Sequence, residues 1–331
     1  MRILVIGKIN PAGLEILEKN FELTIRPYLD GQELIDAVPG YEVILMRVDQ
    51  FITRQVIEAA DKLRIIAIAS IGTDHIDHQA AAERGILVFN VPGGSSQSVA
   101  ETTIGLMLNV TKRLVQANND VKAGIFDRVK YGSQELEGKT LGLVGIGQIG
   151  MRVARLALAF GMKVIANDPY VRIVYDPGVW DGVTPSRQIE MVGFEELLRR
   201  SDIVSLHCPL TDETRHLIST RELAMMQSHA FLINTARGPV VDEQALRDAL
   251  VEKRIAGAPV DVFDEEPTRG VPFRTPLLGL DDASCILSPH IAGVTRESKA
   301  RIGVIVANRI MDEAKQMGIW NGYGGEDGRF S

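Results

Sequence analysis

The stretch Leu141-Gly142-Leu143-Val144-Gly145-Ile146-Gly147-Gln148-Ile149-Gly150 joins an apolar, strand-like run to three glycines in the pattern GxGxxG. A helix-compatible stretch over 151–160 follows, and a second strand-like run leads to Asp168, which lies 18 residues past the third glycine. A strand, a glycine-rich turn, a helix and a carboxylate in this order form the unit that binds dinucleotides in α/β proteins. The stretch therefore predicts a parallel sheet that carries a dinucleotide site.

Each residue type in this motif suits such a site. Gly145 permits the tight turn, Gly147 lets the backbone approach a pyrophosphate, and Gly150 lets the helix pack closely on the strand. Asp168 would accept hydrogen bonds from ribose hydroxyls and repel an added phosphate, which favours NAD over NADP, although Arg172 lies near in sequence. The structural alternatives are glycines that only turn a corner and a solvated turn aspartate.

The rest of the chain repeats this alternation of short apolar runs and longer amphipathic stretches. Uncharged strand-like runs separated by helical patterns are typical of parallel strands buried on both faces, and so of the doubly wound α/β class. The expected strands are Ile3 to Ile6, Val43 to Met46, Ile65 to Ala69, Ile86 to Phe89, Leu141 to Val144, Lys163 to Ala166, Ile203 to Leu206, Phe231 to Ile233, Val260 to Phe263 and Ile286 to Leu287.

The strand runs fall into two series, so two sheets are expected rather than one continuous sheet. A helical pattern from Ser98 to Lys122 and a linker-like stretch from Gly124 to Lys139 separate them, which puts the boundary near residue 100. A last helix is predicted from Arg296 to Met317, and the glycine-rich residues 321–331 lack the apolar content to order themselves.

Composition excludes several classes of function. The 331 residues, 45% of them hydrophobic, suit about two domains of roughly 150 residues. The formal net charge of −7 and the lack of a basic block argue against nucleic acid. No apolar run is long enough for a transmembrane helix or a secretion signal, and two cysteines are too few for a disulfide framework. We therefore expect a cytoplasmic chain without membrane or nucleic-acid partners.

Three charged residues follow strand-like runs in the half that bears the glycine motif: Arg237, Glu266 and His290. Ligands of open α/β sheets bind beyond the carboxyl ends of the strands, so these residues are the candidates for catalysis. A guanidinium pairs with a carboxylate through two hydrogen bonds, and an imidazole exchanges a proton near neutral pH. The set suits a 2-keto acid, whereas a capping arginine, a surface glutamate and a backbone-bonded histidine are the structural alternatives.

Together these motifs resemble the D-isomer-specific 2-hydroxyacid dehydrogenases. The resemblance covers about residues 1–318 and includes two motifs in the first half, Ile71-Gly72-Thr73-Asp74 and Ser98-Val99-Ala100-Glu101. In the second half it rests on Gly145 to Gly150 with Asp168, Asn234-Thr235-Ala236-Arg237-Gly238, Asp261-Val262-Phe263 continuing to Glu266-Pro267, and Ser288-Pro289-His290.

The resemblance implies two Rossmann-like domains with a cleft between them. Residues 1–98 and 291–318 would bind the substrate, residues 99–290 would bind NAD, and residues 319–331 would form a flexible tail. It also implies a homodimer formed through the coenzyme domains. Hydride would pass between the nicotinamide and C2 of a small 2-keto or 2-hydroxy acid, with the cleft closed.

Site roles follow from the same resemblance. His290 would be the acid/base, Glu266 its partner and Arg237 the substrate-binding residue, while the amides of Ile71 and Gly72 would bind the substrate carboxylate. The cofactor contacts implied are Gly145, Gly147, Gln148, Ile149, Gly150, Asp168, His207, Pro209, Thr214, Thr235, Ala236, Asp261, His290 and Gly293.

Within the family, the motifs look most like the phosphoglycerate dehydrogenase branch, and Arg47 matches an arginine that meets a substrate phosphate there. The short stretch after Met317 is expected to hold no regulatory domain. Val48-Asp49-Gln50, Phe126 and the segment Tyr170 to Gln188 depart from that branch. D-3-phosphoglycerate therefore stays open against glyoxylate or hydroxypyruvate.

Two other functions share part of this pattern. An NAD-sensing binding protein of the corepressor kind resembles the family and can retain the trio, whereas a formate dehydrogenase is disfavoured by Glu266. The ligand-rich run Asp74-His75-Ile76-Asp77-His78 lacks a further cluster of ligands, so no metal site is expected.

Overall fold

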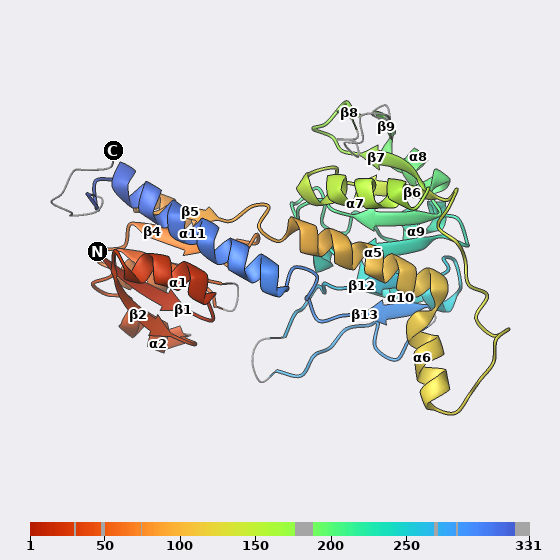
Figure 1. Ribbon diagram of the computed structural model, residues 1–331, viewed down its shortest axis with the longest axis horizontal. Helices are drawn as coiled ribbons and strands as arrows, with labels where there is room; N and C mark the ends of the chain where they lie inside the picture. Colours follow the sequence, from red (N-terminus) through yellow and green to blue (C-terminus); the bar gives the residue numbers. More distant parts are fainter. Residues whose placement is uncertain are drawn as a thin grey trace, which may run out of the picture. The chain divides into compact units, whose positions relative to one another are not determined.

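The computed structural model describes residues 1–29, 31–47, 50–73, 75–175, 188–267, 271–282 and 284–321. The chain forms two compact units, one of Met1–Ser95 with Val294–Ser331 and the other of Ser96–Gly293. Each unit has its own sheet with helices on both faces (Figure 1). The α/β class with two separate sheets is therefore confirmed.

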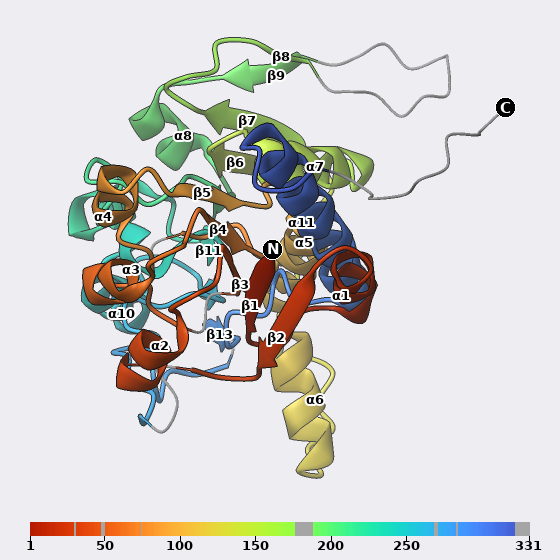
Figure 2. The same cartoon turned by 90° about the vertical axis from the view of Figure 1, so that its left-hand side faces the viewer.

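The first unit is built on a parallel sheet in the order β2-β1-β3-β4-β5. Its strands are β1 (Arg2–Ile6), β2 (Glu22–Arg26), β3 (Val43–Met46), β4 (Ile65–Ile68) and β5 (Leu87–Asn90). Helices α1 (Pro11–Glu18) and α11 (Arg296–Gln316) cover one face, and α2 (Gly31–Ala37), α3 (Arg54–Ala59) and α4 (His78–Glu83) cover the other (Figure 2). Every residue of the central strands β3 and β4 is buried, which explains why these runs carry no charge.

The second unit has a sheet in the order β13-β12-β11-β10-β6-β7-β9-β8, in which β8 is antiparallel to β9 and the other pairs are parallel. Its strands are β6 (Thr140–Val144), β7 (Lys163–Asn167), β8 (Val174–Tyr175), β9 (Gln188–Met191), β10 (Ile203–Leu206), β11 (Phe231–Asn234), β12 (Ala258–Val260) and β13 (Cys285–Leu287).

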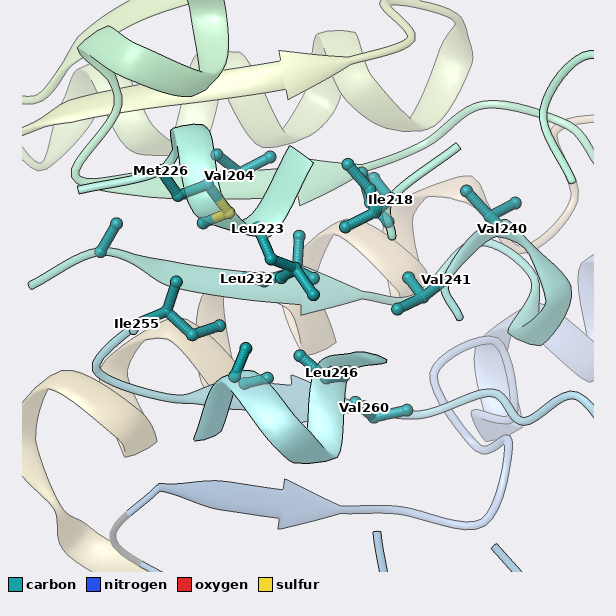
Figure 3. Close-up of a cluster of buried hydrophobic side chains, with 14 of the residues drawn as sticks. Val204, Ile218, Leu223, Met226, Leu232, Val240, Val241, Leu246, Ile255 and Val260 are labelled. Atoms are coloured by element: carbon teal, nitrogen blue, oxygen red, sulfur yellow. The ribbon is translucent and has the colours of Figure 1, made fainter. Parts of the chain in front are cut away.

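Two apolar layers hold this sheet. Helices α5 (Ser96–Lys112) and α7 (Gln148–Ala159) pack on one face. On the other face, α8 (Phe194–Arg200), α9 (Thr220–Met225) and α10 (Glu243–Val251) bury Leu223 and Leu246 against Val204 and Leu232 of the central strands (Figure 3). A packed core of this kind fixes the strand ends, so the loops that follow them leave the sheet at fixed places.

The structure corrects two predicted elements. The helical pattern 98–122 is not one helix: it is broken at Arg113, whose left-handed φ of 53° ends α5 and starts α6 (Leu114–Lys122). Helix α6 buries none of its residues and points away from the sheet (Figure 1). The predicted strand Val260 to Phe263 is displaced, because β12 spans Ala258–Val260 and the buried Asp261 already turns to the following loops.

Candidate active site

The site begins with a contact between Glu266 and His290, which follow β12 and β13. Nδ1 of His290 lies 2.8 Å from Oε2 of Glu266, and the two side chains are 45% and 40% exposed. Because the carboxylate occupies Nδ1, the exposed ring presents Nε2 to a reacting group. The structure thus brings together two of the three residues that the sequence singled out.

The backbone at His290 is held in an unusual conformation. Its φ is 50°, in the left-handed region, and its N–H donates to the Asp261 carbonyl at 2.7 Å. The fully buried Asp261 carboxylate accepts from the Ser288 hydroxyl and from the amides of Ile291 (3.0 Å) and Ala292 (2.9 Å). Strain of this kind persists only where the surroundings enforce it. Asp261, which the sequence placed among the cofactor contacts, therefore holds the His290 loop.

The Arg237 turn follows β11 directly. The Asn234 side chain accepts from the Ala236 amide at 3.1 Å and donates to the Arg237 carbonyl at 2.9 Å, so one amide group spans the turn. A short 3₁₀ turn, Gly238–Val240, comes next. A Cβ at Gly238 would collide with the carbonyl of Phe263, three residues before Glu266. The turn that carries Arg237 thus lies directly against the loop that carries Glu266.

The glycine loop between β6 and α7 fits a pyrophosphate. Gly145 has a φ of 92°, and a Cβ there would lie 2.8 Å from the His207 carbonyl. A Cβ at Gly150 would collide with the Gly145 carbonyl oxygen, whereas one at Gly147 would meet nothing within 4 Å. Gly147, the N-cap of α7, offers no side chain to the first amides of the helix. Those amides and the open approach at Gly147 suit an anion.

Asp168 follows β7 and already holds the glycine loop. Its Oδ2 accepts from the Ile146 amide at 3.1 Å, and its Oδ1 accepts from the Tyr170 amide at 2.9 Å. Each carboxylate oxygen can accept a further hydrogen bond, so ribose hydroxyls remain acceptable partners. The residues present therefore fit a dinucleotide, with the carboxylate fixed beside the phosphate loop.

Other predicted cofactor contacts follow β10 and β11. Thr214 donates its hydroxyl to the Pro209 carbonyl at 2.7 Å, which closes the loop after His207. Burial lowers the pKa of His207 to about 3, so its ring is neutral, with Nε2 2.9 Å from Oγ of Ser205. The remaining contacts lie in the elements described: Gln148 and Ile149 in the first turn of α7, Thr235 and Ala236 buried in the Arg237 turn, and Gly293 at the end of the second unit.

In the first unit, the loop after β4 has backbone amides that can donate hydrogen bonds to a ligand. The carbonyls of Ile71, Gly72 and Thr73 accept hydrogen bonds from the side chains of Asn90, Ser70 and His78, respectively. In the part of the chain that the structure describes, the amides of residues 71–73 donate to no acceptor. A loop whose carbonyls are held back and whose amides are free suits a carboxylate. Sequence reasoning named Ile71 and Gly72 but missed the three side chains that brace them.

The remaining sequence predictions are placed as follows. Arg47 comes directly after β3 in the first unit, half-buried, whereas Val48 and Asp49 lie outside the described residues. Asp74 and residues 176–187 also lie outside them. The described residues contain no group of three or more His, Cys, Asp or Glu side chains placed to hold a metal. Their helices likewise include none that is both long enough and apolar enough to cross a bilayer.

Comparisons with known proteins agree with this geometry. Residues 104–292 match the family model for the NAD binding domain of D-isomer specific 2-hydroxyacid dehydrogenases. The chain is 38% identical over 319 residues to the hydroxypyruvate reductase of Thermotoga maritima, covering 96% of this chain and 99% of that protein. It is 41% identical over 311 residues to the D-3-phosphoglycerate dehydrogenase of Methanocaldococcus jannaschii, covering 94% of this chain but 57% of that protein.

Solved structures extend the likeness to both units. The D-lactate dehydrogenase from Aquifex aeolicus, complexed with NAD and lactic acid, superposes with a TM-score of 0.82 at 32% identity and covers 96% of each chain. The chain spans little more than half the length of the phosphoglycerate dehydrogenase it matches, and nearly all of the reductase. The match to the family model, the identity over nearly the whole chain and the shared fold show that the chain belongs to the D-isomer specific 2-hydroxyacid dehydrogenase family.

Proposed function

We propose that the chain is an NAD-dependent dehydrogenase of 2-hydroxy acids. The observation that supports this most directly is the 2.8 Å contact between Glu266 and His290, which leaves Nε2 of the ring for proton transfer. NADH, when bound, would supply the hydride for C2 of the keto acid. His290 donates the proton that the new hydroxyl needs, Glu266 orients the ring, and the Arg237 guanidinium binds the carboxylate and polarises the carbonyl.

The residues proposed to hold the cofactor lie at the glycine loop and after the carboxyl ends of the neighbouring strands. The first amides of α7, including Gln148 and Ile149, receive the pyrophosphate, and Asp168 accepts from the ribose hydroxyls. The other proposed contacts are His207, Pro209, Thr214, Thr235, Ala236, Asp261, His290 and Gly293, which lie on or after the carboxyl ends of β10, β11, β12 and β13.

The substrate is proposed to bind through its carboxylate to the amides of Ile71 and Gly72, whose carbonyls are held back by Asn90 and Ser70. Arg47 is proposed to bind a phosphate, which makes D-3-phosphoglycerate the first candidate. Glyoxylate or hydroxypyruvate is the second candidate. These keto acids carry no phosphate, so Arg47 would have no role in binding them. The chain would then act as a glyoxylate or hydroxypyruvate reductase.

The test is NADH oxidation with phosphohydroxypyruvate, hydroxypyruvate, glyoxylate and pyruvate, with the His290→Gln variant as the control. Turnover of at least one keto acid, lost in the variant while NADH still binds, is the expected result. NADH binding without turnover of any keto acid would support the NAD-sensing corepressor reading. The ratio of kcat/KM between phosphohydroxypyruvate and glyoxylate then identifies the substrate branch.

We also propose that the chain works as a homodimer through its second unit. Helix α6 and the residues after it expose five large apolar side chains: Leu114 (52%), Val121 (54%), Ile125 (46%), Phe126 (75%) and Val129 (89%). Apolar side chains gathered on one projecting segment mark an interaction surface, and a second copy is the simplest partner. Val129→Asp should shift the mass in sedimentation equilibrium from dimer to monomer, whereas an unchanged mass would contradict this interface.

A cytoplasmic location is proposed as well. Cys208 and Cys285 are free thiols, and burial raises their pKa values to about 11 and about 12, so both stay protonated and unreactive. Cell fractionation tests this location, and recovery with the membranes would contradict it.

A further inference from the structure

Two adjacent threonines of α5 reach both loops of the proposed active site. Oγ1 of Thr102 donates to the Ala292 carbonyl at 3.3 Å, and Oγ1 of Thr103 lies 3.0 Å from Oγ1 of Thr235. Ala292 comes two residues after His290, and Thr235 comes two residues before Arg237. One turn of a single helix is therefore hydrogen-bonded to the loops that carry the acid/base and the substrate-binding residue.

The direction of the Thr103 contact follows from a count of protons. The Thr103 hydroxyl donates to the Val99 carbonyl at 2.8 Å, and a hydroxyl has only one proton to give. The Thr235 hydroxyl is therefore the donor to Thr103. Thr103 is 0% exposed and Thr235 is 7% exposed, and the described residues offer the Thr235 hydroxyl no other acceptor. A buried donor with a single acceptor has one favourable orientation, so Thr103 fixes the start of the Arg237 turn.

Thr111 provides a comparison within the same helix. It is also buried in α5, at 2% exposure, and its hydroxyl bonds only to carbonyls of its own helix, Met107 at 2.8 Å and Leu108 at 3.4 Å. Thr102 and Thr103 differ because each hydroxyl also contacts a residue outside the helix, Ala292 and Thr235 respectively. Helix α5 also begins at Ser96, the first residue of the second unit, and Ala292 lies one residue before its end. The Thr102 contact thus joins the beginning and the end of that unit.

We propose that Thr102 and Thr103 are positioning residues for the dehydrogenase reaction. Thr103 sets the position of Arg237 through Thr235, and Thr102 sets the position of His290 through the Ala292 carbonyl. The proposal rests on the proposed function, because it gives these threonines a role only if Arg237 and His290 act on the substrate. Misplacement of reacting groups by a fraction of an ångström to about 1 Å reduces rates by up to about 10²-fold.

The experiment compares Thr103→Val, Thr103→Ser and Thr111→Val with the wild type in NADH oxidation, with thermal unfolding measured for each. Thr103→Val should raise the KM for the keto acid and reduce kcat/KM by about tenfold, and Thr103→Ser should recover most of the loss because it restores the acceptor. Thr111→Val removes a hydroxyl from the same helix and should leave kcat/KM unchanged. Equal kinetic effects of Thr103→Val and Thr111→Val, or no recovery in Thr103→Ser, would overturn the role of Thr103.

Thr102→Val provides a second test. Because Thr102 is only half-buried, this substitution should disturb the fold less than Thr103→Val. It should lower kcat with little change in KM, the reverse of the split expected for Thr103→Val. A kcat equal to that of the wild type would overturn the role of Thr102. Failure of the proposed function is distinguishable, because the wild type would then turn over no keto acid. Failure of this inference alone leaves His290→Gln and Arg237→Lys impaired and the threonine variants active.

Discussion

Nδ1 of His290 is hydrogen-bonded to Oε2 of Glu266 at 2.8 Å, while the His290 backbone is held at a φ of 50° by the loop around it. His290 is thus held at two points, its ring by the Glu266 carboxylate and its backbone N–H by the Asp261 carbonyl. Both constraints come from the loops after β12, so proton transfer at Nε2 depends on the arrangement of that strand end.

We expect His290→Ala to reduce kcat by about 10²- to 10⁴-fold while NADH still binds, because a positioned acid/base is lost. Glu266→Gln should cause a smaller loss, since the ring keeps a hydrogen-bond acceptor but not a charge. The control is Glu265→Gln, the same chemical change one residue earlier on an exposed side chain. Wild-type rates in the His290 and Glu266 variants would show that the pair has only a structural role.

NADH should be preferred to NADPH, because the Asp168 carboxylate is fixed beside the glycine loop by its contact with Ile146. Asp168→Asn keeps an oxygen for the Ile146 amide but removes the charge, so the preference should shrink without loss of NADH use. The measurement is the ratio of kcat/KM for the two cofactors. The alternative is that Arg172 binds the added phosphate of NADPH. If the wild type uses NADPH better and Arg172→Ala loses that advantage, the arginine rather than Asp168 decides the cofactor preference.

Arg47→Ala should weaken phosphohydroxypyruvate strongly and leave glyoxylate almost unchanged, because a charge-assisted hydrogen bond to phosphate is about twice as strong as a neutral one. Steady-state kinetics with both substrates on both proteins make the comparison. Arg172→Ala, a change of the same residue type in the second unit, is the control. Equal losses for the two keto acids, or wild-type preference for glyoxylate, would remove phosphoglycerate as the substrate.

Acid should destabilise the second unit through His207. Burial lowers its pKa from 6.5 to about 3, so between these values the unfolded chain binds a proton that the folded chain does not. Stability therefore falls as the pH drops below 6.5 and stops changing through this group near pH 3, by up to about 1.4 kcal/mol per pH unit. Urea unfolding across this range should be less pH-dependent in His207→Asn than in the wild type, and His216→Asn, at an exposed histidine, should keep the wild-type slope.

Alanine at two glycines should change stability in opposite directions. A Cβ at Gly13 of α1 would collide with the Gly303 carbonyl of α11, and overpacking of this kind costs about 1–3 kcal/mol. A Cβ at Gly105 of α5 meets nothing within 4 Å, so Gly105→Ala should stabilise by about 0.5–1 kcal/mol through helix propensity. Urea unfolding of both variants tests the pair. If both variants were destabilised equally, neither the collision at Gly13 nor the helix propensity at Gly105 would determine the effect of the added methyl group on stability.

The sequence was most informative where a residue type is required by a local task. Gly145, with its φ of 92°, and the carboxylate after β7 were recognisable because the tight turn and the ribose each need a particular residue. Glu266 and His290 were recognisable because residues at the carboxyl ends of parallel strands meet at one edge. Only the structure shows that they are in contact.

The features that the sequence could not predict depend on residues far away in the chain or lie at the exposed edge of a sheet. The break at Arg113 has no signal in the residue type, since arginine seldom adopts a positive φ. Strand β2 escaped prediction because it is a half-exposed edge strand without an apolar run. The contact of Thr103 with Thr235 joins residues 132 positions apart, and the buried Asp261 carboxylate serves a loop about 30 residues later.

There is no room for a Cβ at Gly238, so the two loops that meet there cannot be changed independently. Because the Arg237 turn and the Phe263 backbone are in van der Waals contact, a change in the length or direction of one loop displaces the other. Transplanting either loop alone from a homologous chain would bring in a backbone path shaped against a different neighbour. Residues 234–238 and 261–266 should therefore be exchanged together. A chimera between two homologous chains should have its junctions outside both segments.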